Sequence, residues 1–259
     1  MTSITIITVS FCSAKTISDT CISVARQTHP QVQHIIVDGA STDETVNIAR
    51  SYARAGAIII SEPDSGIYYA MNKGLRIATG DVIGFLNADD MFTGPDVLSQ
   101  VADAFSDQGI GACFSDLIYV DQDDVSRIRR VWRTRGCKPS ALSIGWIPPH
   151  PTFYVRRSVF ALVGGFDCRL RLAADHELIC RILARKLVRA KYVPGVWVRM
   201  RLGGASNKDL KNIFTQNREI IRTLFRHNVG VSPLWPFFKL FDRIRQMRSA
   251  RLIDAHLSK

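Results

Sequence analysis

The sequence predicts an α/β fold in which a doubly wound, mostly parallel sheet is flanked by helices. Through the first half of the chain, β-branched or continuously apolar runs alternate with segments of helical spacing. This alternation is typical of βαβ units with right-handed crossovers. Several of the apolar runs also end abruptly in Asp, Asn or Gly, at the strand ends where open α/β sheets bind their ligands.

Each element of the first half follows from its own pattern. Residues 4–9 are a β-branched run, and residues 81–86 are an apolar run suited to a buried parallel strand. Ile17, Cys21 and Val24 recur at helical spacing. The expected strands are residues 4–9, 34–37, 57–60 and 81–86, and the expected helices are residues 16–27, 43–53, 66–78 and 96–105.

The second half has a mixed pattern. A Pro-rich loop precedes one short strand, and Gly164 and Gly165 should stop the helix that follows it. The expected strands are residues 112–120, 126–132 and 152–155, and the expected helices are residues 157–163 and 173–184. The remainder is expected to be a basic helical tail with a break at Ser232 and Pro233.

Composition bounds the class of protein. The chain has 259 residues, 46% of them hydrophobic and 22% charged, which is ordinary for a globular protein with one sizeable core. No apolar run approaches the roughly 20 residues that span a bilayer. The apolar N-terminal segment has no basic residues before it, so we expect a first strand and a cytoplasmic protein with reduced thiols.

The net charge of +11 is divided very unevenly along the chain. Residues 1–125 hold 6 Lys or Arg and 16 Asp or Glu, giving −10, whereas residues 126–259 hold 28 and 7, giving +21. This asymmetry indicates a partner for the second half, an anionic membrane or nucleic acid, unless the basic surface is simply solvated. The basic residues follow no nucleic-acid-binding module, so we expect no nucleic acid partner.

A cluster of oxygen ligands ends the fourth expected strand. Asn87-Ala88-Asp89-Asp90 follows the apolar run directly. Hard oxygen ligands at such an edge suit Mg²⁺ or Mn²⁺ together with substrate phosphates. Asp90 alone could instead cap a helix. In the same way, Asp38 precedes a glycine at the end of the second expected strand, which favours contact with a ribose or base.

Five segments in consistent order carry a family resemblance: VDGASTDET, SEPDSGIYYAMNKG, GDVIGFLNADD, HPTFYVRRSVFALVGGFD and AADHELICRI. Together they resemble the family 2 glycosyltransferases, nucleotide-sugar enzymes of GT-A fold, and look closest to the bacterial exopolysaccharide and colanic-acid-type branch. The resemblance covers about residues 4–206. It implies a catalytic domain over 1–206, with a nucleotide-sugar-binding half (1–110) and an acceptor-side half (111–206), and leaves 207–259 as a basic helical extension.

The resemblance also implies roles for matched positions. Asp89 would bind the metal, with Asn87 and Ala88 beside it, and Asp175 would be the catalytic base. The positions implied along the nucleotide sugar are Thr8, Val9, Ser10, Asp38, Asp64, Gly66, Asn72, Lys73 and Gly74. Two departures from the family pattern stand out, Asn87 where many relatives have Asp and Tyr69 where an acid is common.

The chemistry of the residues supports the same mechanism. A metal-bound acid would neutralise the leaving diphosphate, and a separate carboxylate would deprotonate the acceptor hydroxyl for an inverting displacement. Glu177 is an alternative base, and Asp175 could merely cap its helix. His150 and His176 would lie on the acceptor or diphosphate side. A zinc site of His150, His176 and Cys180 lacks recognisable spacing.

The expected activity is therefore transfer of a sugar from a UDP- or GDP-sugar to a saccharide or lipid-linked acceptor in cell-surface polysaccharide synthesis. A sugar-phosphate nucleotidyltransferase should have a glycine-rich loop after the first strand, and residues 8–15 contain no glycine. A catalytically inactive nucleotide-sugar-binding protein is the other alternative. Residues 231–259 include an apolar and aromatic stripe at helical spacing, with basic residues largely off the stripe. This pattern predicts either contact with an anionic membrane or docking on the protein or a second subunit.

Overall fold

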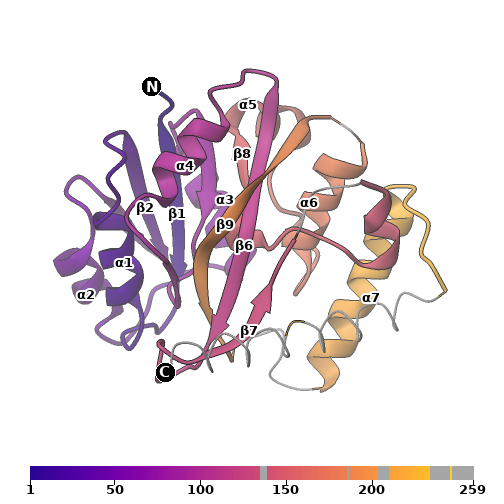
Figure 1. Ribbon diagram of the computed structural model, residues 1–259. Coiled ribbons are helices and arrows are strands. Elements are labelled where there is room, and N and C mark those ends of the chain that lie inside the picture. The colour runs from indigo at the N-terminus through magenta and orange to yellow at the C-terminus, as the bar shows by residue number, and fades with distance from the viewer. Residues whose placement is uncertain (135–138, 186, 204–209, 234–245, 247–259) are drawn as a thin grey trace, which may run out of the picture.

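Four parallel strands form the first half of a nine-stranded sheet in the computed structural model (Figure 1). The structure describes residues 1–134, 139–185, 187–203, 210–233 and 246. These strands lie in the order β3-β2-β1-β4. Their bounds are β1 Ile4–Ser10, β2 Val32–Asp38, β3 Ile58–Ser61 and β4 Val82–Phe85. All four run in one direction, so their carboxyl ends meet at one edge of the sheet.

The second half of the sheet is mixed. The order continues from β4 through β8, β6 and β9 to β5, and β7 pairs with β6. β6 pairs with β9 in parallel, whereas β4–β8, β6–β8, β6–β7 and β5–β9 are antiparallel. The bounds are β5 Asp90–Phe92, β6 Ile110–Val120, β7 Ile128–Trp132, β8 Tyr154–Arg156 and β9 Arg189–Arg201.

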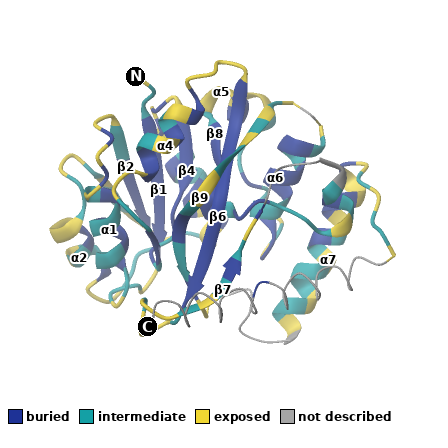
Figure 2. Cartoon of the chain, in the orientation of Figure 1, coloured by how far each residue is buried: buried dark blue, intermediate teal, exposed yellow. Residues whose placement is uncertain are grey.

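Helices cover both faces of the sheet. Successive side chains of a strand point to opposite faces, and the central strands carry apolar side chains on both. Ile7 and Val9 of β1 pack in the same cluster as residues of α3, α5, α6 and α7, whereas Ile4 and Ile6 pack with residues of α1 and α4. β1 and β6 are buried along their whole length (Figure 2). The helices are α1 Ile17–Ala25, α2 Thr45–Tyr52, α3 Ile67–Ile77, α4 Val97–Ala104, α5 Arg157–Val163, α6 Ala174–Ala184 and α7 Leu210–Arg226, with 3-10 turns η1 Pro139–Ile144 and η2 His150–Thr152.

The predicted fold class is confirmed, and the boundaries of the first-half elements differ from expectation by only a few residues. The prediction that the chain after residue 184 is a helical tail was wrong for residues 189–201, which form β9. Pro194 and Gly195 interrupt its strand pattern, and the structure places them where the register between β6 and β9 shifts. Trp197 and Val198 of β9 are fully buried, so packing against β6 decides the strand.

The beginning of the predicted C-terminal extension packs on the rest of the fold. Ile220 and Leu224 of α7 are buried in the same apolar cluster as α6. The predicted aromatic and basic stripe in 231–259 lies, apart from residues 231–233 and 246, outside the described residues.

Candidate functional site

The carboxyl end of β2 is fixed by hydrogen bonds from three neighbouring segments. Asp38 is buried, and its carboxylate accepts hydrogen bonds from Ser10 Oγ (3.0 Å), Ser61 Oγ (2.8 Å) and both the amide and hydroxyl of Ser41 (2.8 and 2.5 Å). Burial alone would raise the pKa of Asp38, but the hydrogen bonds from Ser41, Ser61 and Ser10 outweigh it and lower the pKa. Asp38 thus fastens the ends of β1 and β3 to β2.

The predicted metal-binding segment, residues 87–90, follows the carboxyl end of β4. Asp89 is partly buried, and among the described residues no donor from another residue hydrogen-bonds to its carboxylate. Its backbone carbonyl accepts a hydrogen bond from Nη1 of Arg201 (3.0 Å), at the end of β9. The Arg201 guanidinium also pairs with Asp19 of α1. Burial raises the pKa of Asp89, and Arg201 opposes that rise.

Asp90 has a different environment from Asp89. It begins β5 and caps no helix, so the helix-cap alternative does not apply. Its side chain is fully buried, and both carboxyl oxygens lack a partner in the described part of the chain. Burial, reinforced by Asp89 and opposed by Arg201, raises the pKa of Asp90 well above its usual value.

These residues fit a divalent cation that also has oxygen ligands from a substrate. Asp89 offers a carboxylate without a competing donor, and Oδ1 of Asn87 is buried without a partner in the described chain. No group of three or more His, Cys, Asp and Glu side chains comes together within the described ranges, so the zinc site of His150, His176 and Cys180 is not formed there. A hard cation held by few protein ligands and by phosphate oxygens matches this donor set.

Asp175 lies in the first turn of α6 and is held by a residue of α3. The hydroxyl of Tyr68 donates a hydrogen bond to Asp175 Oδ1 over 3.1 Å. The Tyr68 ring stacks on Phe166, whose centroid lies 5.7 Å away. Asp175 is partly exposed, and within the described chain its carboxylate is hydrogen-bonded by the Tyr68 side chain and makes no capping hydrogen bond at the start of its helix.

His150 connects this aromatic group to β4. Its ring stacks on Phe85 of β4 (5.6 Å between centroids) and meets Phe166 edge-on (5.8 Å). Burial lowers the pKa of His150, and the charge of Asp175 opposes this change. The contacts therefore lead from Asp175 through Tyr68, Phe166 and His150 to Phe85. Phe85 ends β4, four residues before Asp89.

Glu177 and His176 were also predicted to lie on the acceptor side. Their side chains make other contacts. Glu177 is buried and bonds to Arg181 and His227, both at 2.8 Å. His176 Nδ1 lies 3.5 Å from Cys180 Sγ. The geometry therefore leaves Asp175, and not Glu177, as the carboxylate next to the aromatic group.

Residues predicted to lie along the nucleotide make mainly internal contacts. Asn72 bonds both the amide and the carbonyl of Phe166 (2.9 Å each), and Lys73 holds Glu62 and the Pro63 carbonyl (2.9 Å each). A Cβ at Gly74 would lie 2.5 Å from Ile7, so this glycine lets α3 pack closely on β1. These contacts fix the segment that carries Asp64 and Tyr68.

The loop around Asp64 is also ordered by its own hydrogen bonds. Asp64 Oδ1 accepts a hydrogen bond from the Gly66 amide (2.8 Å), where Gly66 adopts a φ of 130° that favours glycine. At the end of β1, Thr8 Oγ1 lies 3.1 Å from His34, Val9 is buried, and Ala88 donates to the Val9 carbonyl (3.2 Å).

An exposed aromatic ring, that of Phe11, lies just after the end of β1. The sequence reasoning did not identify it. Phe11 follows β1, and 67% of it is exposed. A Cβ at Gly39 would lie 3.3 Å from the Phe11 ring and 2.9 Å from the Asp64 carboxylate, so both side chains flank the backbone after Asp38. The available signal was a large aromatic residue directly after the first strand. The sequence reasoning also missed Arg201, because it did not predict β9, the strand that carries this residue.

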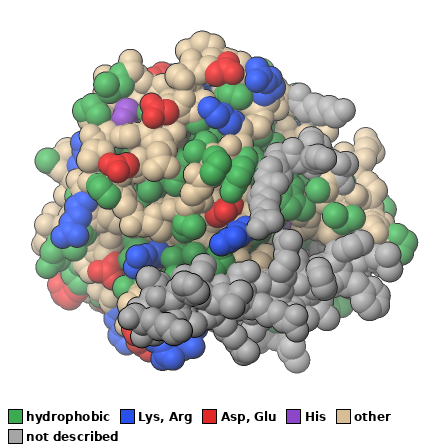
Figure 3. All heavy atoms as spheres, viewed as in Figure 1, with side chains coloured by type: hydrophobic (Ala, Val, Ile, Leu, Met, Phe, Trp, Pro, Cys, Tyr) green, Lys and Arg blue, Asp and Glu red, His purple; other side chains and the backbone are tan. Residues whose placement is uncertain are grey.

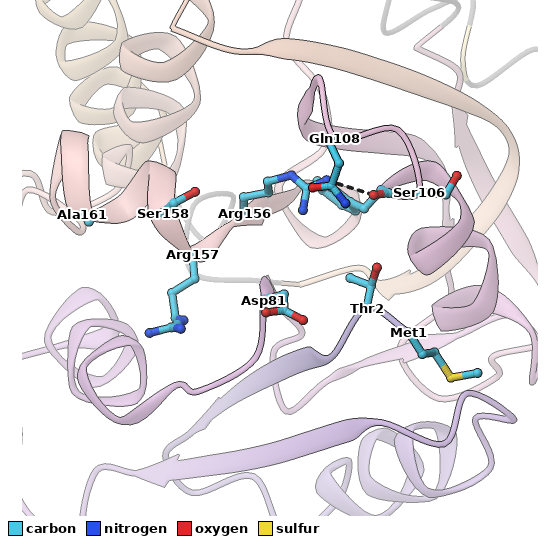
Figure 4. A pocket seen from close by; sticks show the side chains of 10 residues that line it. Met1, Thr2, Asp81, Ser106, Gln108, Arg156, Arg157, Ser158 and Ala161 are labelled. Carbon is cyan, nitrogen blue, oxygen red and sulfur yellow. Dashed lines mark hydrogen bonds between the residues drawn. The ribbon is translucent and has the colours of Figure 1, made fainter.

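A cavity of about 740 Å³ lies at the opposite edge of the sheet, beside the start of β1 (Figure 4). Its charged side chains make internal contacts: Asp81 accepts hydrogen bonds from Ser3, and Arg156 and Arg157 donate to backbone carbonyls. On the face seen in Figure 3, described basic and acidic side chains are interspersed without a continuous basic patch. No helix among the described residues is both long and apolar enough to cross a bilayer.

Comparison with known proteins adds independent evidence. The family model "Glycosyl transferase family 2" matches residues 5–172. A Mycobacterium tuberculosis (strain H37Rv) protein named an uncharacterized glycosyltransferase is 34% identical over 183 residues, 69% of this chain and 68% of its own. A Mycobacterium bovis (strain BCG) PGL/p-HBAD biosynthesis glycosyltransferase is 30% identical over 233 residues, 88% of each chain.

Solved structures share the fold. The Pyrobaculum calidifontis mannosyltransferase PcManGT, in complex with GDP-Man and Mn²⁺, has a TM-score of 0.61 at 18% identity, covering 98% of this chain and 75% of its own. The S. aureus protein TarS (residues 1–349), in complex with UDP-GlcNAc, has a TM-score of 0.64 at 17% identity, covering 86% and 66%.

Proposed function

The chain belongs to glycosyltransferase family 2, and on this premise we propose that it transfers a sugar from a nucleotide diphosphate sugar to a hydroxyl group with inversion of the anomeric centre. The observation that carries the proposal is the environment of two carboxylates. Asp89, which follows β4, accepts no hydrogen bond on its carboxylate from another described residue. Asp175 is held by Tyr68, whose ring packs through Phe166 and His150 on Phe85 of β4. The reaction requires these two separate acids.

In the proposed reaction, Asp175 takes the proton of the acceptor hydroxyl. Tyr68 fixes Oδ1 of Asp175, which leaves Oδ2 to receive that proton. The acceptor oxygen forms a bond to the anomeric carbon as the bond from that carbon to the diphosphate breaks. The electron pair of the broken bond leaves with the nucleoside diphosphate, and a single displacement of this kind inverts the centre.

Asp89, with Asn87 beside it, is the residue that would hold Mg²⁺ or Mn²⁺. When bound, the cation supplies positive charge that stabilises the departing diphosphate. The high pKa of Asp89 supports this assignment, because a bound cation would offset the cost of keeping a partly buried carboxylate charged. Arg201 holds the backbone of Asp89 in place from β9.

At the nucleotide end, we propose that Phe11 stacks on the base. Its exposed ring lies beside the Gly39 backbone and next to Asp64, at the edge where β1 and β2 end. Because its carboxylate already accepts four hydrogen bonds, Asp38 would act mainly by fixing the strand ends around the nucleotide. Asp64 retains one carboxyl oxygen for a ribose or base.

The acceptor is proposed to be a lipid-linked saccharide or glycolipid of the cell surface. The relative named for PGL/p-HBAD biosynthesis, which matches 88% of this chain, supports this class. A Bacillus subtilis relative named as a putative teichuronic acid biosynthesis glycosyltransferase, 38% identical over 90 residues, supports it too. Structural neighbours named with UDP-GlcNAc and GDP-Man support a UDP- or GDP-sugar donor.

Membrane contact through residues 231–259 remains a proposal. The basic and aromatic sequence of this segment favours an anionic surface. A flotation assay with vesicles containing phosphatidylglycerol tests it, and equal binding of the full chain and of a chain ending at residue 230 would contradict it.

The activity is tested by assaying sugar transfer and donor hydrolysis with Mn²⁺ and a panel of UDP- and GDP-sugars. We expect Asp175→Asn to lose about 100-fold or more of the rate while still binding the donor, because a general base contributes that much. Asp107→Asn, an exposed carboxylate at the other edge, is the matched control. If no nucleotide sugar binds the wild-type protein, or if Asp175→Asn keeps full activity, the proposed function is wrong.

A further inference from the structure

A second cavity, of about 390 Å³, lies between α6, the loop after α5 and the end of α7. Its ionisable lining consists of four arginines, one histidine and two carboxylates. The arginines are Arg169, Arg181, Arg185 and Arg226. Four guanidinium groups against two carboxylates leave an excess of at least two positive charges, whatever the protonation state of the histidine.

Both carboxylates are already fully engaged within the protein. Asp167 accepts hydrogen bonds from Arg169 Nε and Nη2 (2.8 Å each) and from Arg226 Nη1 (2.9 Å). Glu177 is bonded to Arg181 and His227, both at 2.8 Å. These contacts hold the guanidinium groups of Arg169, Arg181 and Arg226 beside the cavity without a ligand.

The basic groups, in contrast, retain unused binding capacity. Arg185, at the C-terminal end of α6, is exposed, and its side chain forms no ion pair or hydrogen bond with the described residues. The Arg169 and Arg226 side chains are 81% and 47% exposed although both contact Asp167. Arg181 Nε is buried without a partner in the described chain. The cavity therefore has more donors than acceptors.

We propose that this cavity binds a phosphate group. The planar guanidinium fork matches phosphate oxygens, and several forks converging from different elements favour a doubly charged monoester over a carboxylate. Arg185 and Arg226 would supply the main contacts, because they lie on two helices and neither has more than one internal partner. The phosphate group is either free or carried by a lipid.

The cavity is separate from the proposed reaction site but shares a wall with it. Asp167 follows Phe166, which packs on Tyr68 and His150, and Glu177 lies two residues after Asp175 on α6. A ligand there would join α6 to α7 without touching the donor edge. The proposal does not depend on glycosyl transfer, and it is tested by binding alone.

The test is isothermal titration and thermal shift with inorganic phosphate, at constant ionic strength set with chloride, on the full chain. We expect phosphate to raise the melting temperature of the wild type by mass action. Arg185→Gln should weaken phosphate binding about tenfold, which corresponds to the loss of one charge-assisted contact. Arg226→Gln should weaken it as well, and Arg185→Lys should recover only part of the loss because it lacks the fork.

Arg222→Gln is the matched control, since Arg222 is an exposed arginine on α7 outside the cavity. Equal phosphate binding by Arg185→Gln, Arg222→Gln and the wild type, or no binding by the wild type, would overturn the proposal. So would phosphate binding abolished by saturating UDP and Mn²⁺, because that result places the phosphate at the donor edge. Arg185 has no internal partner to lose, so the folding of Arg185→Gln should match that of the wild type.

A second arm distinguishes the source of the phosphate. Vesicles containing phosphatidic acid carry a phosphomonoester, whereas vesicles containing phosphatidylglycerol carry only a phosphodiester. Binding to the first in an Arg185-dependent manner, with displacement by inorganic phosphate, would assign a lipid-borne group. Phosphate binding without Arg185-dependent vesicle binding would assign a free phosphate.

Discussion

The hydroxyl of Tyr68 donates a hydrogen bond to Oδ1 of Asp175 over 3.1 Å, joining residues that are 107 positions apart in the chain. Burial, reinforced by the nearby charge of Asp175, raises the pKa of Tyr68 well above its usual value. Tyr68 therefore stays protonated and remains a donor throughout the working range of an enzyme. This contact fixes the orientation of the proposed base from the helix that follows the nucleotide loop.

Replacing Tyr68 by Phe should lower kcat for sugar transfer by about tenfold, the effect of losing one oriented hydrogen bond. The KM for the donor should change little, because the ring still packs on Phe166. Steady-state kinetics at saturating acceptor measure both values. Tyr69→Phe is the control, since Tyr69 lies next in sequence but is 44% exposed. A kcat unchanged in Tyr68→Phe would remove the positioning role.

Replacing Phe11 by Ala should weaken nucleotide binding by about 1–3 kcal/mol, the usual value of stacking one base on an aromatic ring. Stability should hardly change, because most of this side chain is exposed. Titration with UDP and GDP in the presence of Mn²⁺ measures the loss, and Phe11→Tyr should retain most of the affinity. Phe214→Ala removes an equally exposed ring from α7 and should have no effect. Equal losses in both variants would contradict base stacking at Phe11.

Replacing Asp89 by Asn should abolish the stabilisation that Mn²⁺ gives in the presence of a nucleoside diphosphate, because the carboxylate proposed to bind the cation is lost. Thermal shift with and without EDTA measures the effect. Asp103→Asn serves as the control, because Asp103 is exposed on α4. Retention of the Mn²⁺-dependent shift in Asp89→Asn would show that the cation is held elsewhere.

The free energy of unfolding should fall as the pH drops from about 6.5 to about 4, because of His34. Burial, with a contribution from the charge of Arg54, lowers the pKa of His34 from 6.5 to about 4. In this window the unfolded chain binds a proton that the folded protein excludes, so stability is lost as the pH falls. The loss amounts to about 3 kcal/mol when the pH is below both values.

Chemical denaturation at a series of pH values, in the wild type and in His34→Gln, measures this dependence. The variant should lose stability less steeply between pH 6.5 and 4, whatever its stability at pH 7. Parallel curves for the two proteins would mean that other groups govern the acid sensitivity of the fold.

The alternation of strands and helices in the first half could be predicted from the sequence. Each strand and helix there has its own hydrophobic periodicity, and turn residues separate them. The strand runs of β1 and β4, and the polar residues that end them, give a local signal that does not depend on distant contacts. The position of Asp89 at a strand end, and of Asp175 near a helix start, could be predicted for the same reason.

β9 could not be predicted in this way. Its sequence is basic and interrupted by Pro194 and Gly195, and it becomes a strand only because β6 and β5 pair with it along its length. Arg201 reaches the backbone of Asp89 only through that pairing, across 112 positions. Likewise, nothing in the local sequence showed that Asp38 would be saturated by three serines or that Glu177 would be tied to His227.

The sequence by itself determined which strands exist in the first half and which carboxylates end them, because hydrophobic period and turn chemistry are properties of short segments. Only the tertiary structure decided which carboxylates are free. Among the described residues, the carboxylate of Asp89 has no donor from another residue and that of Asp175 has only Tyr68, whereas Asp38, Asp167 and Glu177 are each held by several internal donors. The physical reason is that a carboxylate's partners are set by long-range packing, which no local pattern records.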